Sequence, residues 1–122
     1  MERIYFITYK EKRVLIQDAS NMNGGSEFKK IIQQAKKTIK SEPLNSILAL
    51  FDASNCSFSD ETMTVMKDYV QGNTPYIKAV AVVGATGLLQ MALSTLARSS
   101  GREFNSFKTR EEALEFLTSY DE

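Results

Sequence analysis

The sequence predicts a single α/β domain of element order ββαβαβαβα, in which right-handed βα crossovers build a mixed five-stranded sheet. Short runs rich in apolar and β-branched residues alternate along the chain with segments of helical periodicity. A few polar residues separate the first two runs, which favours an antiparallel hairpin, whereas helical segments separate the later runs and imply parallel pairing. The 122 residues, 43% of them apolar, suffice for one core without disulfides or metal. No repeat, low-complexity run or linker divides the sequence, so we treat residues 1–122 as one domain.

The first three elements are predicted within the first 40 residues. Residues 3–9 and 13–18 are rich in β-branched and aromatic side chains, and they predict two strands joined by a short polar hairpin. Turn-forming residues at 20–26 lead into a helix, for which Ser26 is the expected N-cap with Glu27 in the first turn. The apolar residues of this helix recur at the spacing of one helical face: Phe28, Ile31, Ile32, Ala35 and Ile39.

The middle of the chain predicts two buried strands around a second helix. The first helical pattern stops by Pro43, and residues 46–52 form a continuous apolar run, as expected for a strand that is covered on both faces. The second helix starts at Ser59 and stops at the Gly-Asn pair that precedes Pro75. Residues 77–83 predict the next buried strand. The inner stripe of the second helix is Thr62, Val65, Met66, Tyr69 and Val70.

The C-terminal part predicts a short strand between two helices. Residues 84–87, Gly-Ala-Thr-Gly, turn the chain into a third helix that ends near Gly101. Leu89 stands where a dinucleotide-binding fingerprint needs its third glycine, so a glycine-assisted turn explains this loop better than nucleotide binding does. Residues 103–107 predict the fifth strand. Thr109 opens a capping box for a final helix, whose apolar residues are Ala113, Leu114, Phe116 and Leu117.

The composition excludes several kinds of catalytic site. The chain has no histidine, so serine–histidine and cysteine–histidine arrangements are impossible within it. Its single cysteine, Cys56, permits no internal disulfide, and a thiolate zinc site would need another chain. This cysteine usage suits a reducing compartment. No signal-peptide core follows the N-terminus, and the longest nearly apolar stretch, residues 88–97, is too short to span a bilayer. We expect a small soluble cytoplasmic protein that is not an enzyme and needs no cofactor or metal.

The element order and several segments resemble the STAS domain, which occurs in anti-sigma-factor antagonists and in the cytoplasmic tails of sulfate transporters. The resemblance is carried by residues 47–54, which lead through a short loop into a helix, and by residues 5–9, 74–80 and 107–114. These segments are similar to the divergent bacterial branch often labelled STAS/CRAL-TRIO-like. The resemblance covers nearly the whole chain, and it lies in strand and cap patterns rather than in catalytic motifs.

The STAS resemblance implies that the second helix presents a regulatory face to protein partners. In phosphorylatable members, an Asp-Ser-Ser-Gly loop stands at the start of that helix, and a kinase modifies the first serine. The corresponding residues here are Asp60, Glu61, Thr62 and Met63, so only the aspartate is retained. Glu61 cannot be phosphorylated, although its fixed charge imitates part of a phosphorylated state. We therefore do not expect the phosphorylation switch.

The predicted partner-binding site is the start of the second helix. Serine followed by acidic residues is also an ordinary helix cap, since it satisfies unpaired backbone amides and suits the helix dipole. Capping is therefore its main physical role, and partner binding can coexist with it because helix starts are exposed. The residues of this candidate site are Ser57, Ser59, Asp60, Glu61 and Thr62.

A second candidate site is apolar and involves the third helix. Apolar residues nearly encircle this helix between residues 88 and 97, which indicates that it is buried or covered by something. A central helix flanked by its neighbours, a homodimer face and a groove for a lipid or other apolar ligand all remain open; methionines would give adaptable packing. The residues proposed for the dimer face or ligand groove are Met63, Met66, Leu89, Met91 and Leu93.

Charge is unevenly distributed, although the 15 basic and 15 acidic side chains cancel. Residues 1–40 hold 9 basic and 4 acidic side chains, and residues 41–122 hold 6 and 11. The first helix has a basic outer face, which we interpret as a solvated surface with at most weak affinity for an acidic partner or peripheral contact with an anionic membrane. Nucleic acid is not an expected partner. The lysines of this face are Lys29, Lys30, Lys36, Lys37 and Lys40.

Taken as a whole, the sequence favours a non-enzymatic regulatory or protein-interaction domain that resembles anti-sigma-factor antagonists. The alternative is a small protein that binds a lipid or other apolar ligand beneath the third helix. Enzymatic activity is the third and least favoured hypothesis, because no carboxylate pair or activated nucleophile stands out in the sequence. Cys56 is interpreted as a small, half-buried loop residue, although a nearby helix N-terminus could lower the pKa of its thiol.

Overall fold

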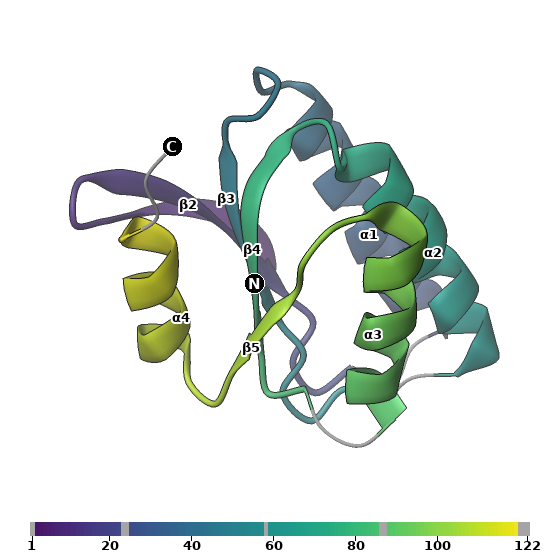
Figure 1. Ribbon diagram of the computed structural model, residues 1–122. Coiled ribbons are helices and arrows are strands. Elements are labelled where there is room, and N and C mark those ends of the chain that lie inside the picture. The colour runs from purple at the N-terminus through teal and green to yellow at the C-terminus, as the bar shows by residue number, and fades with distance from the viewer. Residues whose placement is uncertain (1, 23–24, 58, 86–87, 120–122) are drawn as a thin grey trace.

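The computed structural model describes residues 2–22, 25–57, 59–85 and 88–119, and it confirms the predicted order ββαβαβαβα (Figure 1). The predicted Gly-Ala-Thr-Gly turn lies partly outside the described residues, because residues 86 and 87 are not among them. The elements are β1 (Ile4–Tyr9), β2 (Lys12–Asp18), α1 (Gly25–Lys40), β3 (Ile47–Asp52), α2 (Asp60–Asn73), β4 (Ile77–Val83), α3 (Leu88–Ser100), β5 (Asn105–Phe107) and α4 (Arg110–Thr118).

The five strands form one mixed sheet in the order β1-β2-β3-β4-β5. β1 pairs antiparallel with β2 through a two-residue turn, in which Lys10 and Glu11 have φ angles of 50° and 69°, as a type I′ turn requires. The other neighbours are parallel, and the register places Asp18 beside Asp52 at the carboxyl ends of β2 and β3. α1, α2 and α3 lie on one face of the sheet, and α4 lies on the other (Figure 1).

The core has two layers because each strand sends alternate side chains to opposite faces. The five predicted core residues of α1 are all buried against the sheet, together with apolar residues of α2 and α3. On the other face, Ala113 and Leu117 of α4 are completely buried over β2, β3 and β4. Every residue of β3 is buried, which confirms the prediction of a strand covered on both faces.

Two of the three predicted helix caps are confirmed. At α2, the Ser59 hydroxyl accepts from the Thr62 amide at 3.3 Å, and the Thr62 hydroxyl accepts from the Ser59 amide at 2.7 Å. At α4, the Thr109 hydroxyl accepts from the Glu112 amide at 3.2 Å, which is the N-cap half of the predicted capping box. The Glu112 carboxylate accepts from the Thr109 hydroxyl at 3.4 Å. The Ser26 cap is wrong, since α1 begins one residue earlier, at Gly25. Gly25 has a φ of +71°, a left-handed conformation that glycine adopts without the steric cost of a side chain.

α3 has an ordinary buried stripe rather than a buried surface all round. Leu89, Leu93 and Leu96 point into the core, whereas the Met91 side chain is 68% exposed. The apolar residues that nearly encircle the helix in the sequence are therefore not all covered. No described helix is both long and apolar enough to cross a membrane.

β5 is shorter than predicted and begins at Asn105 instead of Glu103. The Arg102 guanidinium lies against the edge of the sheet and donates to the carbonyls of Thr74 and Ile77 at 2.9 and 2.6 Å. The guanidinium thus supplies the hydrogen bonds that these backbone carbonyls accept, and a longer β5 is not needed to supply them.

Candidate functional site

The predicted partner site covers the first turn of α2 and part of the segment that precedes it. We call residues 53–57 and 59 the β3–α2 segment. Ser57, Ser59, Asp60 and Glu61 are exposed. Thr62, the fifth predicted residue, is only 2% exposed, because its side chain turns back to complete the cap with Ser59. The structure thus brings four of the five residues together on one exposed surface, and it places Thr62 beneath them.

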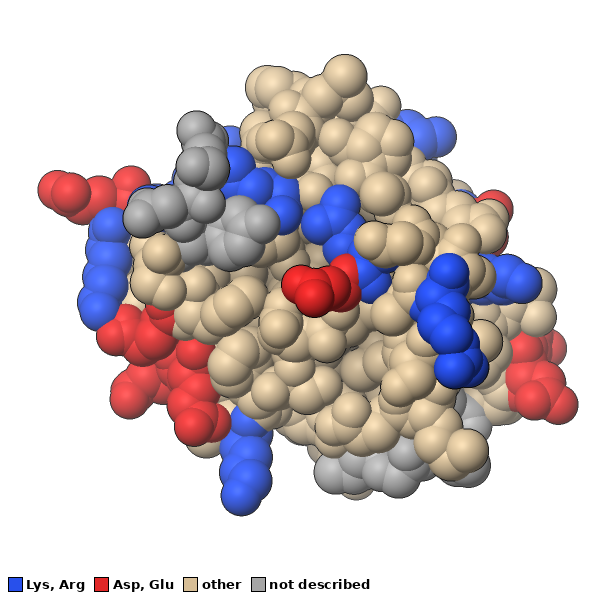
Figure 2. Space-filling view, in the orientation of Figure 1, with Lys and Arg blue, Asp and Glu red and all other residues tan. Residues whose placement is uncertain are grey.

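Ion pairs connect α2 with the basic face of α1, one at this surface and one further along the helix. Glu61 lies 2.9 Å from Lys29, and Asp68 lies 2.6 Å from Lys36. The hydrogen bond and charge of Lys36 lower the pKa of Asp68. α2 therefore neutralises part of the lysine face. On the side of the molecule seen in Figure 2, acidic side chains gather over α4, whose exposed acids are Glu111, Glu112 and Glu115.

The five residues proposed for a dimer face or apolar groove do not meet on one surface. Met66, Leu89 and Leu93 are buried in the core between the sheet and the helices. Met63 is half-buried against the same core, and Met91 faces outward from α3. Of these five side chains, Met91 is the one that is exposed to a partner or ligand.

A small cavity lies beneath α2, with a volume of about 50 Å³. Its lining is mostly apolar, with Phe51, Val70 and Ile77 among its residues. Tyr69 is buried at this cavity and donates a hydrogen bond to the Gln17 side chain. Burial raises the pKa of Tyr69, so its hydroxyl remains protonated and keeps donating.

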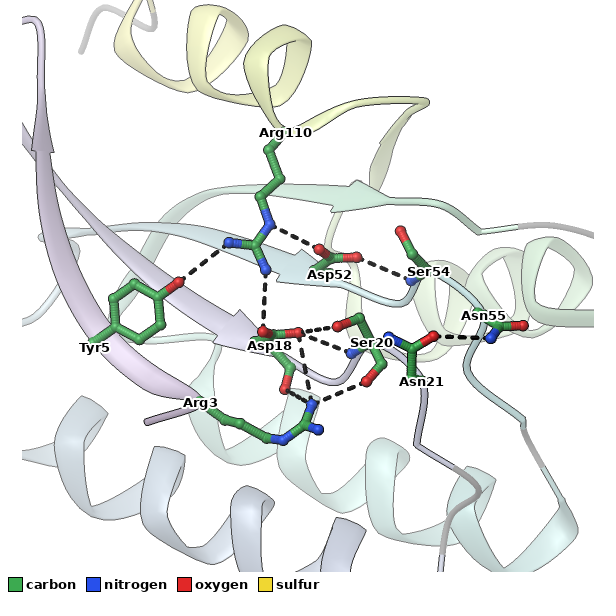
Figure 3. Close-up of polar contacts among 9 residues, drawn as sticks. All are labelled: Arg3, Tyr5, Asp18, Ser20, Asn21, Asp52, Ser54, Asn55 and Arg110. Carbon is green, nitrogen blue, oxygen red and sulfur yellow. Dashed lines mark hydrogen bonds and ion pairs between the residues drawn. The ribbon is translucent and has the colours of Figure 1, made fainter. Parts of the chain in front are cut away.

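A polar cluster that the sequence analysis missed lies at the carboxyl ends of β2 and β3 (Figure 3). Arg110, the first residue of α4, places its Nε 2.8 Å from Oδ2 of Asp52 and its Nη2 3.3 Å from Oδ2 of Asp18. Its Nη1 donates to the Tyr5 hydroxyl at 3.2 Å. The two carboxylates are nearly buried, with 8% and 9% of their side chains exposed, and they share the Arg110 guanidinium. Arg3 supplies a second positive charge, with its Nη1 3.8 Å from Oδ1 of Asp18.

The two strand ends repeat the same sequence and the same local structure. Asp-Ala-Ser-Asn occurs at residues 18–21 and again at residues 52–55. In both copies the aspartate Oδ1 accepts from the serine amide at 3.0 Å. The asparagines, Asn21 and Asn55, have φ angles of 63° and 56°, and the Asn55 side chain donates to that of Asn21 at 2.9 Å. The tetrapeptides form adjacent, equivalent turns, which we call the twin loops.

A second arginine completes the cluster. Arg3 donates through Nη1 to the carbonyls of Asp18 and Ser20, at 3.1 and 3.0 Å. Burial alone would raise the pKa of Asp18, but hydrogen bonds from the Ser20 hydroxyl and amide, with the charges of Arg110 and Arg3, lower it overall. The pKa of Arg110 is raised, because its bonds to Asp52 and Tyr5 outweigh its burial. Both groups of the Asp18–Arg110 pair are therefore ionised near neutral pH.

The cluster corrects the expectation that no carboxylate pair stands out. The repeated tetrapeptide is the sequence signal that could have located it, since parallel neighbours end at the same edge of a sheet. Both carboxylates are already engaged by Arg110, which disfavours their use for a metal cation. Among the described residues, no group of three or more Cys, Asp or Glu side chains is arranged to hold a metal ion.

Cys56 lies in the β3–α2 segment and is half-buried, as predicted. The suggestion that a helix N-terminus lowers its pKa is wrong, because burial raises the pKa of the thiol. A thiol with a raised pKa is a poor nucleophile at neutral pH.

Comparison with known proteins supports the fold and not a particular family. No family model and no curated protein sequence matches the chain. The structure is similar to the crystal structure of an uncharacterized protein of the DUF3478 family with a SpoIIAA-like fold, from Shewanella loihica PV-4. The two share 17% sequence identity with a TM-score of 0.75, over 93% of this chain and 91% of that chain. The chain therefore has the SpoIIAA-like, or STAS-like, fold that its element order and strand patterns predicted.

Proposed function

We propose that this protein is a non-enzymatic regulatory domain that binds a protein partner through the β3–α2 segment and the first turn of α2. The observation that carries the proposal is the joint exposure of Ser57, Ser59, Asp60 and Glu61 on a helix start held by a capping box. A polar surface that is already fixed loses less conformational entropy on binding, which favours partner recognition. The STAS-like fold supports the proposal, since the STAS resemblance assigns the second helix to partners.

The polar cluster at the carboxyl edge is better suited to holding the fold than to catalysis. Asp18 and Asp52 are engaged by Arg110, and the lowered pKa of Asp18 makes it a poor general acid near neutral pH. The raised pKa of Cys56 likewise disfavours nucleophilic chemistry and suits a structural thiol in a reducing compartment. These features favour a binding protein of the cytoplasm over an enzyme.

The proposal is tested by site-specific photo-crosslinking in the native cell. A photoreactive amino acid replaces Ser57 in one variant and Glu111, an exposed residue of α4, in a matched control. We expect one protein to be captured from position 57 and not from position 111. Its affinity for the purified chain should fall in Asp60→Lys and be unchanged in Glu111→Lys. Capture of the same proteins from both positions, or an affinity that Asp60→Lys leaves intact, would contradict the proposal.

The alternative is a protein that binds a lipid or other apolar ligand beneath α3. The apolar cavity described above lies beneath α2 instead, and no α3 residue is among its lining residues. Small-molecule sites usually enclose about 300–1,000 Å³, and this cavity measures about 50 Å³. A lipid would therefore require α2 and α3 to move away from the sheet. Native mass spectrometry of freshly purified protein distinguishes the two functions, because a copurified lipid adds a defined small mass, whereas a protein partner adds the mass of a whole chain.

A further inference from the structure

The position of Arg110 links three separate parts of the fold. Arg110 begins α4, whereas Asp18 and Asp52 end β2 and β3. The ion pairs at 2.8 and 3.3 Å therefore connect the start of α4 with the ends of two neighbouring strands that come much earlier in the chain. Figure 3 shows the guanidinium between the two carboxylates, with Tyr5 at its third nitrogen.

A continuous set of hydrogen bonds leads from these carboxylates to the proposed partner surface. Asp52 accepts from the Ser54 amide, and the Asn21 amide donates to the Ser54 carbonyl at 2.9 Å. The Ser57 amide then donates to the Met22 carbonyl at 2.9 Å. The β3–α2 segment is thus held against the loop that follows β2. Each aspartate held by Arg110 also fixes the turn that follows its own strand, Asp18 through the Ser20 amide and Asp52 through the Ser54 amide.

α4 depends on tertiary contacts for its own stability. It spans only nine residues, and isolated helices shorter than about 12 residues are marginal in water. It is the one described helix on its face of the sheet, where Ala113 and Leu117 supply its buried contacts. A short helix of this kind is folded while it is docked on the sheet and loses its structure when it detaches. Side chains elsewhere that contact only the docked helix therefore lose their contacts whenever the helix detaches.

We propose that Arg110 couples the docking of α4 to the conformation of the twin loops and the β3–α2 segment. While α4 is docked, its arginine holds Asp18 and Asp52, and the twin loops keep the observed hydrogen bonds. When α4 leaves the sheet, both carboxylates lose their shared cation, and the loops and the β3–α2 segment loosen together. The coupling itself needs no partner; that it would regulate partner binding rests on the proposed function.

The geometry requires arginine rather than any cation. Three guanidinium nitrogens address three different groups, on β1, β2 and β3. A lysine ammonium is a single compact charge on a flexible stem, and it cannot reproduce this planar fork. Arg110 is therefore a positioning residue, and Arg110→Lys should restore charge without restoring the coupling.

Residue-resolved amide hydrogen exchange tests the coupling on the purified chain alone. Arg110→Gln should speed exchange of the Asn21 and Ser57 amides by about tenfold or more, since their local opening no longer requires breaking the arginine contacts. Arg110→Lys should behave like Arg110→Gln. The exposed Arg98 of α3 is the matched surface control, and Arg98→Gln should leave both amides unchanged.

Two further variants separate coupling from a general loss of stability. Leu96→Ala weakens the core beneath α3, and it should speed the most protected core amides more than those of the twin loops. Asp52→Asn keeps the shape of the side chain, and it should loosen Ser57 even if Arg110→Gln fails to fold. Faster exchange confined to α4 in Arg110→Gln, full protection in Arg110→Lys, or unchanged exchange of Ser57 in Asp52→Asn would overturn the coupling. Because no partner is present, these outcomes do not depend on the proposed function.

Discussion

The Nε atom of Arg110 lies 2.8 Å from the Asp52 carboxylate, although 58 positions separate the two residues in the chain. Asp18, in register with Asp52, lies on the same guanidinium. A contact between such distant segments stabilises only the complete sheet with α4 docked on it. Its contribution to stability is therefore a sensitive test of this arrangement.

The Asp18 carboxylate should stabilise the fold near neutral pH and not in acid. Its pKa in the folded chain lies below the ordinary value of 3.8, so its contribution is fully present above that value and is lost as the pH falls through the folded pKa. Asp18→Asn should lower the free energy of unfolding at pH 7 by about 1.5–3 kcal/mol. Urea titrations between neutral and strongly acidic pH should show this difference shrinking below pH 3.8. A difference that stays constant or grows in acid would rule out this role.

The Gln17 side chain should destabilise the fold when the buried hydrogen bond from Tyr69 is removed. Tyr69→Phe leaves the Gln17 oxygen buried without a donor and should cost about 1–3 kcal/mol in the free energy of unfolding. Adding Gln17→Leu to that variant should recover part of the loss, because the unpaired Gln17 oxygen is then gone, whereas Asn73, which also bonds the Tyr69 hydroxyl, remains. Tyr76→Phe, at a half-buried tyrosine, is the control and should be nearly neutral in the same denaturation measurement.

Charged substitutions on α3 should separate its buried side from its exposed side. Leu89 and Leu93 are each 7% exposed, so replacing both with Glu buries two unpaired charges and should unfold the domain. Met91→Glu should leave circular dichroism and thermal stability unchanged. The opposite outcome has two parts: the wild-type chain sediments as a dimer, and the Leu89→Glu/Leu93→Glu variant is a folded monomer. That outcome would place these leucines at a dimer interface.

Glu61 should be a minor contributor to stability and a fixed charge rather than a switch. It forms an exposed ion pair with Lys29 and lies in the first turn of α2. Glu61→Ser should therefore cost only about 0.3–1 kcal/mol in urea unfolding. Intact-mass analysis of protein from its native cell should show no phosphoryl group. A substantial phosphorylated fraction mapping to Ser57, Ser59 or Thr62 would show that a switch operates at a neighbouring position.

Gly84 should tolerate a side chain less well than Gly101 does. Both have positive φ angles, 76° and 73°, so alanine strains the backbone similarly at each. A Cβ on Gly84 would also lie 2.7 Å from the Ser54 Cα and closer still to its Oγ, whereas a Cβ on Gly101 meets nothing within 4 Å. Gly84→Ala should therefore be less stable than Gly101→Ala by about 1 kcal/mol or more in thermal unfolding. Equal losses of thermal stability in the two variants would mean that the loop at residues 52–55 moves aside for the new Cβ without losing stability.

The sequence by itself determined the features that depend on neighbouring residues. The buried run of β3 and the single apolar face of α1 follow from periodicities within one element. The caps at Ser59 and Thr109 depend on partners three residues away, so local pattern identified them correctly. The element order then limited the topology to a parallel sheet with an N-terminal hairpin, and the exposed polar start of α2 followed from its cap.

Only the tertiary structure decided which distant groups meet. The side of α3 that carries Leu89 and Leu93 faces the core because of the crossover that places the helix, and an apolar pattern around the whole helix could not choose it. The repeated Asp-Ala-Ser-Asn is present in the sequence, yet the register of β2 with β3 is what makes the two copies neighbours. Arg110 finds both aspartates because α4 returns across the opposite face of the sheet. Its charge, its length and its distance along the chain do not determine its partners; the packing of α4 does.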